Sequence, residues 1–400
     1  MRKKMQRSMA LLLALAMSFS LLGATAWATE VTGETKPDTA ATSESAEEAN
    51  TPTKTEKNNE KDSSQETASE ETEEKQQEEQ QPAAKPKEET TAEAEEKQEP
   101  EIVLSSGDDV VVDSGTCGQN LTWTLNQAGT LCISGSGEMR QWDSTDTPWD
   151  SQRKKVSKVE IANGVTSIGN YAFRNCVNLT SVIIPDSVTG VGNGAFNNCS
   201  SLTSVTIPAG VVSIAPWAFE GCSSLTSVNI PGSVTTINNY AFKDCRSLTS
   251  VMIPDSVVSI GVDVFCGCSS LERIDVAESN KEYCSINGIL FDKNMTKLIG
   301  YPAGKQDSTY TIPNSVVSIG CSAFYGCNNL KSIMIPDSVV SIGNSAFYGC
   351  SSLNSVMIPD SVTSIGGGAF RNCSGLTSVT IPGSMTSVSG EMFAGCSSLT

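Results

Sequence analysis

A unit of 23 residues recurs along the second half of the chain and constrains the fold more than any other feature. In the copy at residues 201–222 it reads Leu-x-x-Val-x-Ile-Pro, then Val-x-x-Ile, then Ala-Phe-x-x-Cys. Self-similarity at a fixed period of roughly 20–50 residues is typical of a solenoid. The repeated aromatic and thiol positions, which we expect to form a core ladder, are Phe173, Phe196, Phe219, Phe242, Phe265, Phe324, Phe347, Phe370 and Phe393, with Cys176, Cys199, Cys222, Cys245, Cys268, Cys327, Cys350, Cys373 and Cys396.

Each unit predicts one coil of chain. Val205 and Ile207 alternate with small hydroxyl residues, which indicates a short strand with its apolar side turned inward. Pro208 has no N–H and ends that strand. A second extended piece follows at Val211 and Ile214, and the segment to Cys222 is long enough for one helical turn. One coil cannot offset its own ordering entropy, so the coils must stack to fold.

These recurring motifs resemble the BspA-type leucine-rich repeat family, which comprises bacterial surface proteins and some protist proteins. The resemblance covers about residues 156–400. It implies a β-rich solenoid of about nine coils, with one inserted hairpin near 272–308. The segment Tyr283–Lys305 resembles an interruption common in that family. Its apolar runs 289–291 and 297–299 predict a hairpin that projects from one edge of the stack.

Residues 1–28 have the features of a signal peptide. A basic start precedes an apolar run, and Ala26 and Ala28 fit the small-x-small pattern for cleavage after Ala28. The run of about 15 residues is shorter than the roughly 20 that a membrane span needs, although a span is the alternative. We therefore expect an exported protein with no membrane span after processing.

Residues 29–101 form an acidic linker. They contain 23 Asp or Glu and 8 Lys, and no Phe, Trp, Tyr, Leu or Cys. Such a segment cannot bury enough apolar surface to order itself, so we expect disorder. A solvated spacer and an acidic interaction tail both fit this composition.

Residues 102–155 predict a small β cap for the open end of the solenoid. Two alternating runs, 121–125 and 130–133, flank a four-residue turn. Trp142 and Trp149 are placed to cover the first coil. The solenoid then occupies 156–400. Leu399 and Thr400 begin a further coil, so we expect that the chain continues or is a fragment.

The chain offers little for catalysis. It has no histidine, which removes the usual general base, Ser-His and Cys-His pairs and imidazole ligands. Asp186, Asp255, Asp337 and Asp360 lie in the repeated Pro-Asp-Ser turn, which is ordinary turn chemistry. Residues 102–400 carry 15 basic and 22 acidic residues, with no basic stripe to bind nucleic acid. We expect no enzyme activity, no cofactor and no metal site.

Fourteen cysteines in an exported chain raise the question of disulfides. Cysteines on the repeat point in parallel from neighbouring coils, which favours buried free thiols over bridges. The off-register residues are the better candidates for a disulfide, and Cys117–Cys132 in the cap is the pair we expect if one forms. The off-register cysteines are Cys117, Cys132, Cys266, Cys284 and Cys321.

The outward strand residues are the part of the repeat free to vary. They align into a strip of hydroxyls with exposed apolar residues, which is either a solvated sheet face or a binding surface. We name this set the outward column, and expect it to bind a partner together with the hairpin around Phe291. The outward column comprises Ile183, Thr206, Asn229, Met252, Met334, Met357 and Thr380.

The family resemblance implies a secreted or cell-surface protein that binds extracellular or host-matrix proteins or other cells, without catalysis. Two alternatives stay open: a repeat array that positions an enzymatic domain beyond Thr400, or a passive stalk spanning the cell wall.

Overall fold

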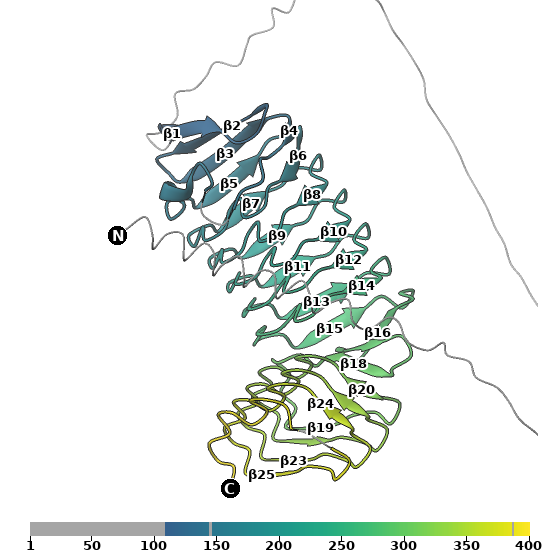
Figure 1. The fold of residues 1–400 in the computed structure, drawn as a ribbon. Coiled ribbons are helices and arrows are strands. Elements are labelled where there is room, and N and C mark those ends of the chain that lie inside the picture. The colour runs from purple at the N-terminus through teal and green to yellow at the C-terminus, as the bar shows by residue number, and fades with distance from the viewer. Residues whose placement is uncertain (1–108, 144–145, 386–387) are drawn as a thin grey trace, which may run out of the picture. The chain divides into compact units, whose positions relative to one another are not determined.

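The computed structural model describes residues 109–143, 146–385 and 388–400, all within the compact unit Glu95–Thr400. These residues form a β-solenoid, as predicted (Figure 1). The predicted signal peptide with Ala26 and Ala28, the predicted acidic linker and the start of the predicted cap lie outside the described residues.

The N-terminal module has the predicted hairpin, together with two strands that were not predicted, β1 and β4. Its elements are β1 (Val111–Thr116), β2 (Leu121–Asn126), β3 (Thr130–Gly135), β4 (Gly137–Glu138) and the 3-10 helix η2 (Asp150–Gln152). β1, β2 and β3 pair antiparallel. β3 then pairs in parallel with β5 of the first coil, so that Leu131 lies opposite Val159. The cap therefore extends the strand ladder of the solenoid and covers its first edge.

Each coil up to the one that contains β23 contributes one strand to each of two columns, because two apolar alternations precede its Phe, and β25 begins the last described coil. The first-strand column contains β5 (Lys158–Ile161), β7 (Ser181–Ile183), β9 (Ser204–Thr206), β11 (Ser227–Asn229), β13 (Ser250–Ile253), β15 (Arg273–Val276), β19 (Thr309–Thr311), β21 (Ser332–Met334), β23 (Ser355–Met357) and β25 (Ser378–Thr380). The second-strand column contains β6 (Val165–Ile168), β8 (Gly190–Val191), β10 (Ser213–Ile214), β12 (Thr236–Ile237), β14 (Ser259–Ile260), β18 (Lys297–Gly300), β20 (Ser318–Ile319), β22 (Ser341–Ile342) and β24 (Ser364–Ile365). Where neighbouring strands pair in these columns, they are parallel and one repeat apart.

The Ala-Phe segment forms a third side of the coil and is not helical, so the predicted helical turn is wrong. Its alternate N–H groups leave the local turn and donate to the next coil. The Phe173 N–H donates to the Ala195 carbonyl at 2.8 Å, and the Phe196 N–H donates to the Ala218 carbonyl at 2.9 Å. A helix would pair these N–H groups with carbonyls of the same segment. Here they donate to carbonyls of the next coil, so the hydrogen bonds hold neighbouring coils together.

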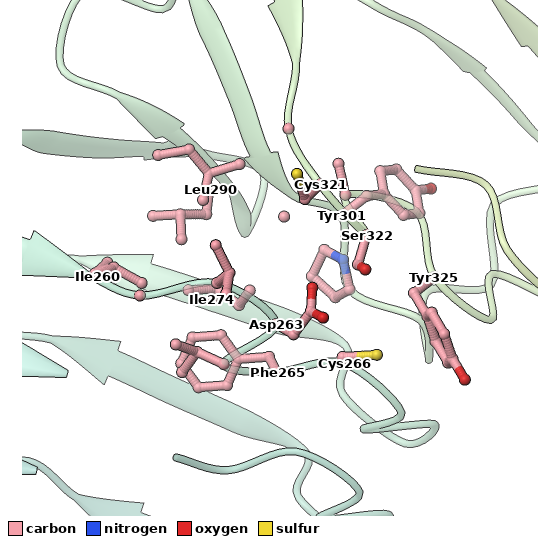
Figure 2. A pocket seen from close by; sticks show the side chains of 18 of the residues that line it. Ile260, Asp263, Phe265, Cys266, Ile274, Leu290, Tyr301, Cys321, Ser322 and Tyr325 are labelled. Atoms are coloured by element: carbon pink, nitrogen blue, oxygen red, sulfur yellow. The ribbon is translucent and has the colours of Figure 1, made fainter. Parts of the chain in front are cut away.

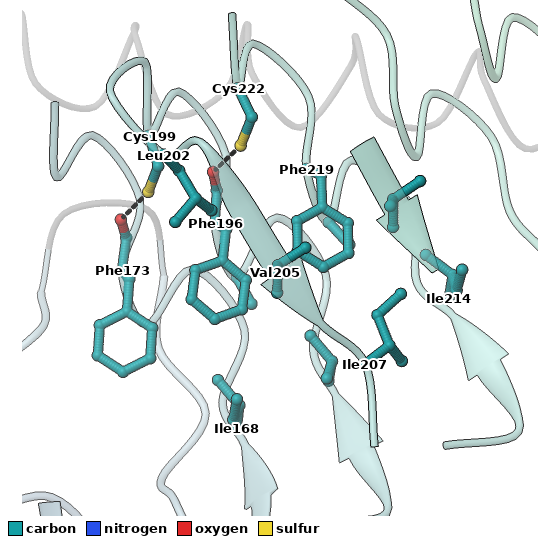
Figure 3. Close-up of a cluster of buried hydrophobic side chains, with 14 of the residues drawn as sticks. Ile168, Phe173, Phe196, Cys199, Leu202, Val205, Ile207, Ile214, Phe219 and Cys222 are labelled. Carbon is teal, nitrogen blue, oxygen red and sulfur yellow. Dashed lines mark hydrogen bonds between the residues drawn. The ribbon is translucent and has the colours of Figure 1, made fainter. Parts of the chain in front are cut away.

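The aromatic side chains stack along the solenoid axis (Figure 3). The rings of Phe196 and Phe219 lie parallel with centroids 5.5 Å apart. Trp149 of the cap starts this stack, with its ring centroid 5.7 Å from that of Phe173, and is fully buried. Trp142 is also buried and meets Trp149 edge to face. The two tryptophans therefore cover the first coil, as predicted.

The Gly after the second-strand Ile lets the coils approach. A Cβ built on Gly192 would lie 2.5 Å from the Asn170 backbone nitrogen of the preceding coil, and one on Gly343 would lie 2.6 Å from that of Cys321. Both distances are well inside van der Waals contact, so any side chain here would push two coils apart. This explains the recurrence of Ile-Gly.

The predicted hairpin of runs 289–291 and 297–299 is confirmed, because these runs pair antiparallel in the structure, but the interruption around it differs from the prediction. Tyr301 takes the place of the repeated Phe, since its N–H donates to the Ala323 carbonyl at 2.7 Å as Phe173 does to Ala195. The stretch predicted as one repeat with an insertion is therefore two coils. The inserted part is β16 (Tyr283–Ile286) and β17 (Ile289–Asp292), which pair antiparallel with each other. β17 also pairs with β18, which continues in parallel to β20, so the hairpin is built into the sheet and does not project.

Candidate interaction surface

The ladder cysteines have a specific role in the core. The thiol of Cys222 donates to the Phe196 carbonyl of the preceding coil at 3.2 Å, and that of Cys199 donates to the Phe173 carbonyl at 3.1 Å (Figure 3). The same bond recurs at Cys245, Cys268, Cys327, Cys350, Cys373 and Cys396. A thiol is small, apolar and still a weak donor, so it fills the core and satisfies a carbonyl at once.

Burial keeps these thiols protonated. It raises the pKa of Cys176, Cys222 and Cys268 to about 12, and raises those of Cys199 and Cys245 well above the usual value. Thiolate is the nucleophilic form, so the ladder cysteines are chemically inert near neutral pH.

Three members of the predicted core ladder are only partly buried. Phe265 is one, because the inserted strands β16 and β17 move the next coil away from it. Phe393 and Cys396 are the others, in the last described coil, where no further coil is described. The other predicted ladder residues are buried.

The prediction that the ladder cysteines are free thiols is confirmed, and the Cys117–Cys132 pair that was expected if any disulfide formed is absent. All fourteen cysteines are free in the structure, and the Cys132 thiol instead lies 3.8 Å from the Glu160 carboxylate. Cys117 is buried in the cap, whereas Cys132 is half-buried and points to the first coil.

Thiol accessibility gives a first test. We expect alkylation of the native protein at pH 7 to label the exposed Cys321 and to spare Cys199, Cys222 and Cys245, which should react once the chain is unfolded. Cys222→Ser should lower the free energy of unfolding by about 1 kcal/mol, since its hydroxyl can still donate to the Phe196 carbonyl but is more polar. Mass spectrometry of labelled peptides is the measurement, and a Cys199–Cys222 bridge would contradict this description.

Every member of the outward column is exposed. The exposed fractions are highest at Met334 and Met357, at 64% and 76%, while Ile183 and Met252 are at 54% and 55%. Thr206, Asn229 and Thr380 are exposed as well. The flanking Val and Ile are buried in most coils. One side of each strand therefore packs in the core, and the side that carries the outward column faces solvent.

The structure does not bring all of these residues together. Met334 and Met357 are direct partners in parallel strands β21 and β23. Met252 pairs with Asp275, but the neighbour of Met334 on that side is Thr311. The repeat pattern alone predicts a single coil, that of Asp275, between Met252 and Met334. This is wrong, because the interruption adds the coil of Thr311.

Phe291 is not part of any exposed surface. It lies in β17, is 1% exposed and belongs to the core cluster that contains Ile289 and Leu298. The side of β17 that carries Phe291 faces the core, and the prediction that it joins the partner-binding surface is wrong.

Met334 and Met357 therefore define the most exposed apolar part of the column. They lie next to the exposed serines Ser332 and Ser355, which pair with each other two residues earlier in the same parallel strands. Methionine is flexible and polarizable, and it adapts to varied partner surfaces. Such a patch offers contact area for a protein and carries no group suited to acid, base or nucleophilic chemistry.

Two further findings concern the described ranges only. No helix in them has the length and apolar character to cross a membrane. They also hold no cluster of three or more His, Cys, Asp or Glu side chains arranged to bind a metal ion.

Tyr301 is the residue that sequence analysis missed. It precedes Phe324 by one period, and its ring stacks on Phe324 with centroids 5.1 Å apart. The Cys327 thiol points to its carbonyl at 3.7 Å, as other ladder thiols do to Phe. The sequence does place an aromatic residue at the repeat spacing here. The position is hard to recognise because Gly300 and Gly304 replace the Ala and Cys that accompany the other repeated aromatic residues.

Parallel coils, a continuous ladder of aromatic and thiol side chains and short strands every 23 residues define a leucine-rich-repeat solenoid. A family model described as BspA type Leucine rich repeat region matches residues 151–272 and 304–400, in six copies. The chain belongs to this family.

Solved structures show the same fold. A leucine-rich repeat protein from Eubacterium ventriosum is 33% identical, with 72% of this chain and 77% of that one covered and a TM-score of 0.65. A leucine rich cell surface protein from Faecalibacterium prausnitzii is 28% identical, with 72% and 93% covered and a TM-score of 0.53. The pneumococcal vaccine antigen PcpA, at 20% identity, 69% and 83% covered and a TM-score of 0.53, shares the fold. No curated protein matches the chain significantly.

Proposed function

We propose that this protein is a bacterial cell-surface protein whose solenoid binds partner proteins through the outward column, without catalysing a reaction. The observation that carries the proposal is the side-by-side placement of Met334 and Met357, at 64% and 76% exposed, on an ordered sheet. An exposed apolar patch lowers solubility unless a partner covers it, so its presence on the surface favours a binding role. The rigid sheet also loses little conformational entropy when a partner binds.

The location rests on the N-terminal sequence and on a relative. The Faecalibacterium prausnitzii structure is described as a cell surface protein. Residues 1–28 carry the features of an export signal that is cleaved after Ala28. N-terminal sequencing of secreted material should begin at Thr29, and a membrane-embedded protein that retains Met1 would contradict export with cleavage.

The partners that we propose are extracellular or host-matrix proteins or the surfaces of other cells. In the test, the purified full chain is applied to immobilised matrix proteins and to bacterial cells. We expect saturable binding to at least one of them, weakened only slightly by salt, because the residues of the outward column are all uncharged. A chain that is folded and binds none of these surfaces would favour a passive stalk, and binding only by a larger protein that includes an enzymatic domain would favour an accessory array.

A further inference from the structure

The two coils that flank the interruption come apart on the Ala-Phe side. The inserted strands β16 and β17 stand next to β18 in the second-strand column, and the hydrogen-bonded run β10-β12-β14 ends at β14. The N–H of Ile260 in β14 donates to the Tyr283 hydroxyl at 3.0 Å, where a neighbouring strand would otherwise accept it. Two extra strands therefore hold the coil of Tyr301 away from the coil of Phe265.

This separation interrupts the hydrogen-bond ladder between coils. In the preceding coil, the N–H groups of Tyr240, Phe242 and Asp244 donate to the carbonyls of Val262, Val264 and Cys266 at 3.1, 3.1 and 2.8 Å. The equivalent N–H groups are those of Asp263, Phe265 and Gly267. Within the described residues none of these three has an acceptor, although the coil of Tyr301 follows. They form an open edge of three aligned donors.

A cavity lies against this open edge. It has a volume of about 380 Å³, within the usual range for ligand sites. It is lined by residues of the insertion and of the coils of Phe265, Tyr301 and Phe324, and Asp263 and Phe265 of the open edge are among them. Phe265, Ile274 and Leu290 give it an apolar wall, and Tyr301 and Ser322 lie across from Asp263 (Figure 2). The aromatic stack is broken here as well: Phe265 stacks on Phe242 on one side, and Tyr301 stacks on Phe324 in the other direction.

Asp263 supplies a charge that the protein leaves unmatched. Its Oδ1 atom is buried and has no hydrogen-bond partner in the described structure. The other charged residues in the lining are Glu282, Asp292 and Lys297, and Asp292 already accepts bonds from Thr296 and from the Lys297 backbone. The lining is therefore net acidic. A buried carboxylate oxygen without a donor is costly, and a cationic group would satisfy it.

We infer that this slot binds an extended segment of a partner protein that carries a Lys or Arg between apolar residues. Three alternate carbonyls of the segment accept from the N–H groups of Asp263, Phe265 and Gly267, as the next coil does elsewhere, and its basic side chain meets Asp263. This is strand addition at a gap in the ladder. The acidic residues 29–101 of the chain are unsuited to the slot, since they would place carboxylates beside Asp263.

The fold itself suggests a probe. The segment that fills the corresponding place two coils earlier, against the coil of Phe219, is residues 238–246, which contains Ala-Phe-Lys. Its carbonyls at Asn239, Ala241 and Lys243 accept from the N–H groups of Trp217, Phe219 and Gly221. In the intact stack the Lys243 ammonium lies 3.2 Å from the Glu220 carboxylate of the preceding coil. A capped peptide with the sequence of residues 238–246, with Ser in place of Cys245, presents the same carbonyls and a lysine to the open edge.

The experiment measures binding of this peptide to the full chain by fluorescence anisotropy, and amide hydrogen exchange of the protein with and without it. In the free protein, the amides of Asp263, Phe265 and Gly267 should exchange much faster than those of Tyr240, Phe242 and Asp244, and saturating peptide should slow them. Asp263→Asn should weaken binding severalfold, and Asp337→Asn, at an exposed turn, should not. A peptide with Glu in place of the lysine should bind more weakly than the parent.

The inference is overturned if saturating peptide leaves exchange at the three amides unchanged, if Asp263→Asn binds as well as the parent, or if a synthetic peptide from residues 29–101 binds more tightly than the basic one. The site is separate from Met334 and Met357, so a negative result here leaves the proposed role of the outward column intact.

Discussion

Replacing Phe219 by Ala should lower the free energy of unfolding by about 3–5 kcal/mol, the usual cost of removing a buried Phe. Phe219 is 1% exposed, and its ring lies 5.5 Å from those of both Phe196 and Phe242. The substitution therefore removes two ring contacts and leaves a cavity between coils that cannot collapse without breaking the hydrogen bonds that join them. Urea unfolding monitored by circular dichroism is the measurement.

Two comparisons make this prediction specific. Phe219→Leu keeps most of the apolar volume and should cost clearly less than Phe219→Ala. Trp217→Ala changes an aromatic residue of the same coil that is 37% exposed, and it should also cost less. A loss below about 1 kcal/mol for Phe219→Ala would mean that the aromatic stack contributes little to the stability of the array.

Replacing Met334 and Met357 together by Lys should reduce binding of the full chain to its partner surface at least severalfold. The two side chains are adjacent in register, so the change places two ammonium groups in the middle of the apolar patch, where a partner would have to desolvate them. Both residues are exposed, and the free energy of unfolding should change by no more than about 0.5 kcal/mol per site.

The matched control is Val340→Lys with Thr363→Lys, which adds the same charge to exposed positions of the same two coils outside the outward column. It should leave binding unchanged. Met252→Lys alone should have a smaller effect than the Met334 and Met357 pair, because Met252 pairs with Asp275 and lies beyond the interruption. Equal loss in the control pair and the Met pair would show that net charge, and not the column, governs binding.

The repeat pattern predicted the regular coils because a single physical constraint determines the residue type at each position in them. Val205 and Ile207 alternate because a strand has two sides, and Phe219 and Cys222 recur because identical coils stack in register. What the pattern could not supply was the direction of the thiol hydrogen bond. That bond runs from Cys222 to a carbonyl one coil earlier, and depends on the exact offset between coils.

Prediction failed mainly where the repeat breaks. Tyr301 keeps the aromatic position but not the Ala and Cys beside it, so its coil was taken for an insertion. That error placed Phe291 on a projecting hairpin, when β17 is covered by the core. The open edge at Asp263 was not predictable either, since the residues of its coil look regular and only the position of the following coil removes their acceptors.

The most direct test of the account is to find which side of the coil the partner touches. A photo-crosslinking amino acid is placed at Met357 in one version of the full chain and at Thr363 in another. Both positions are exposed in the same coil, but Met357 lies in β23 of the first-strand column and Thr363 directly precedes β24 of the second-strand column. Each version is irradiated on the cell or matrix surface that it binds, and the crosslinked partner is detected by mass spectrometry. The account predicts a crosslink from position 357 and none from position 363. A crosslink from position 363 alone would place the binding surface on the other column and contradict it.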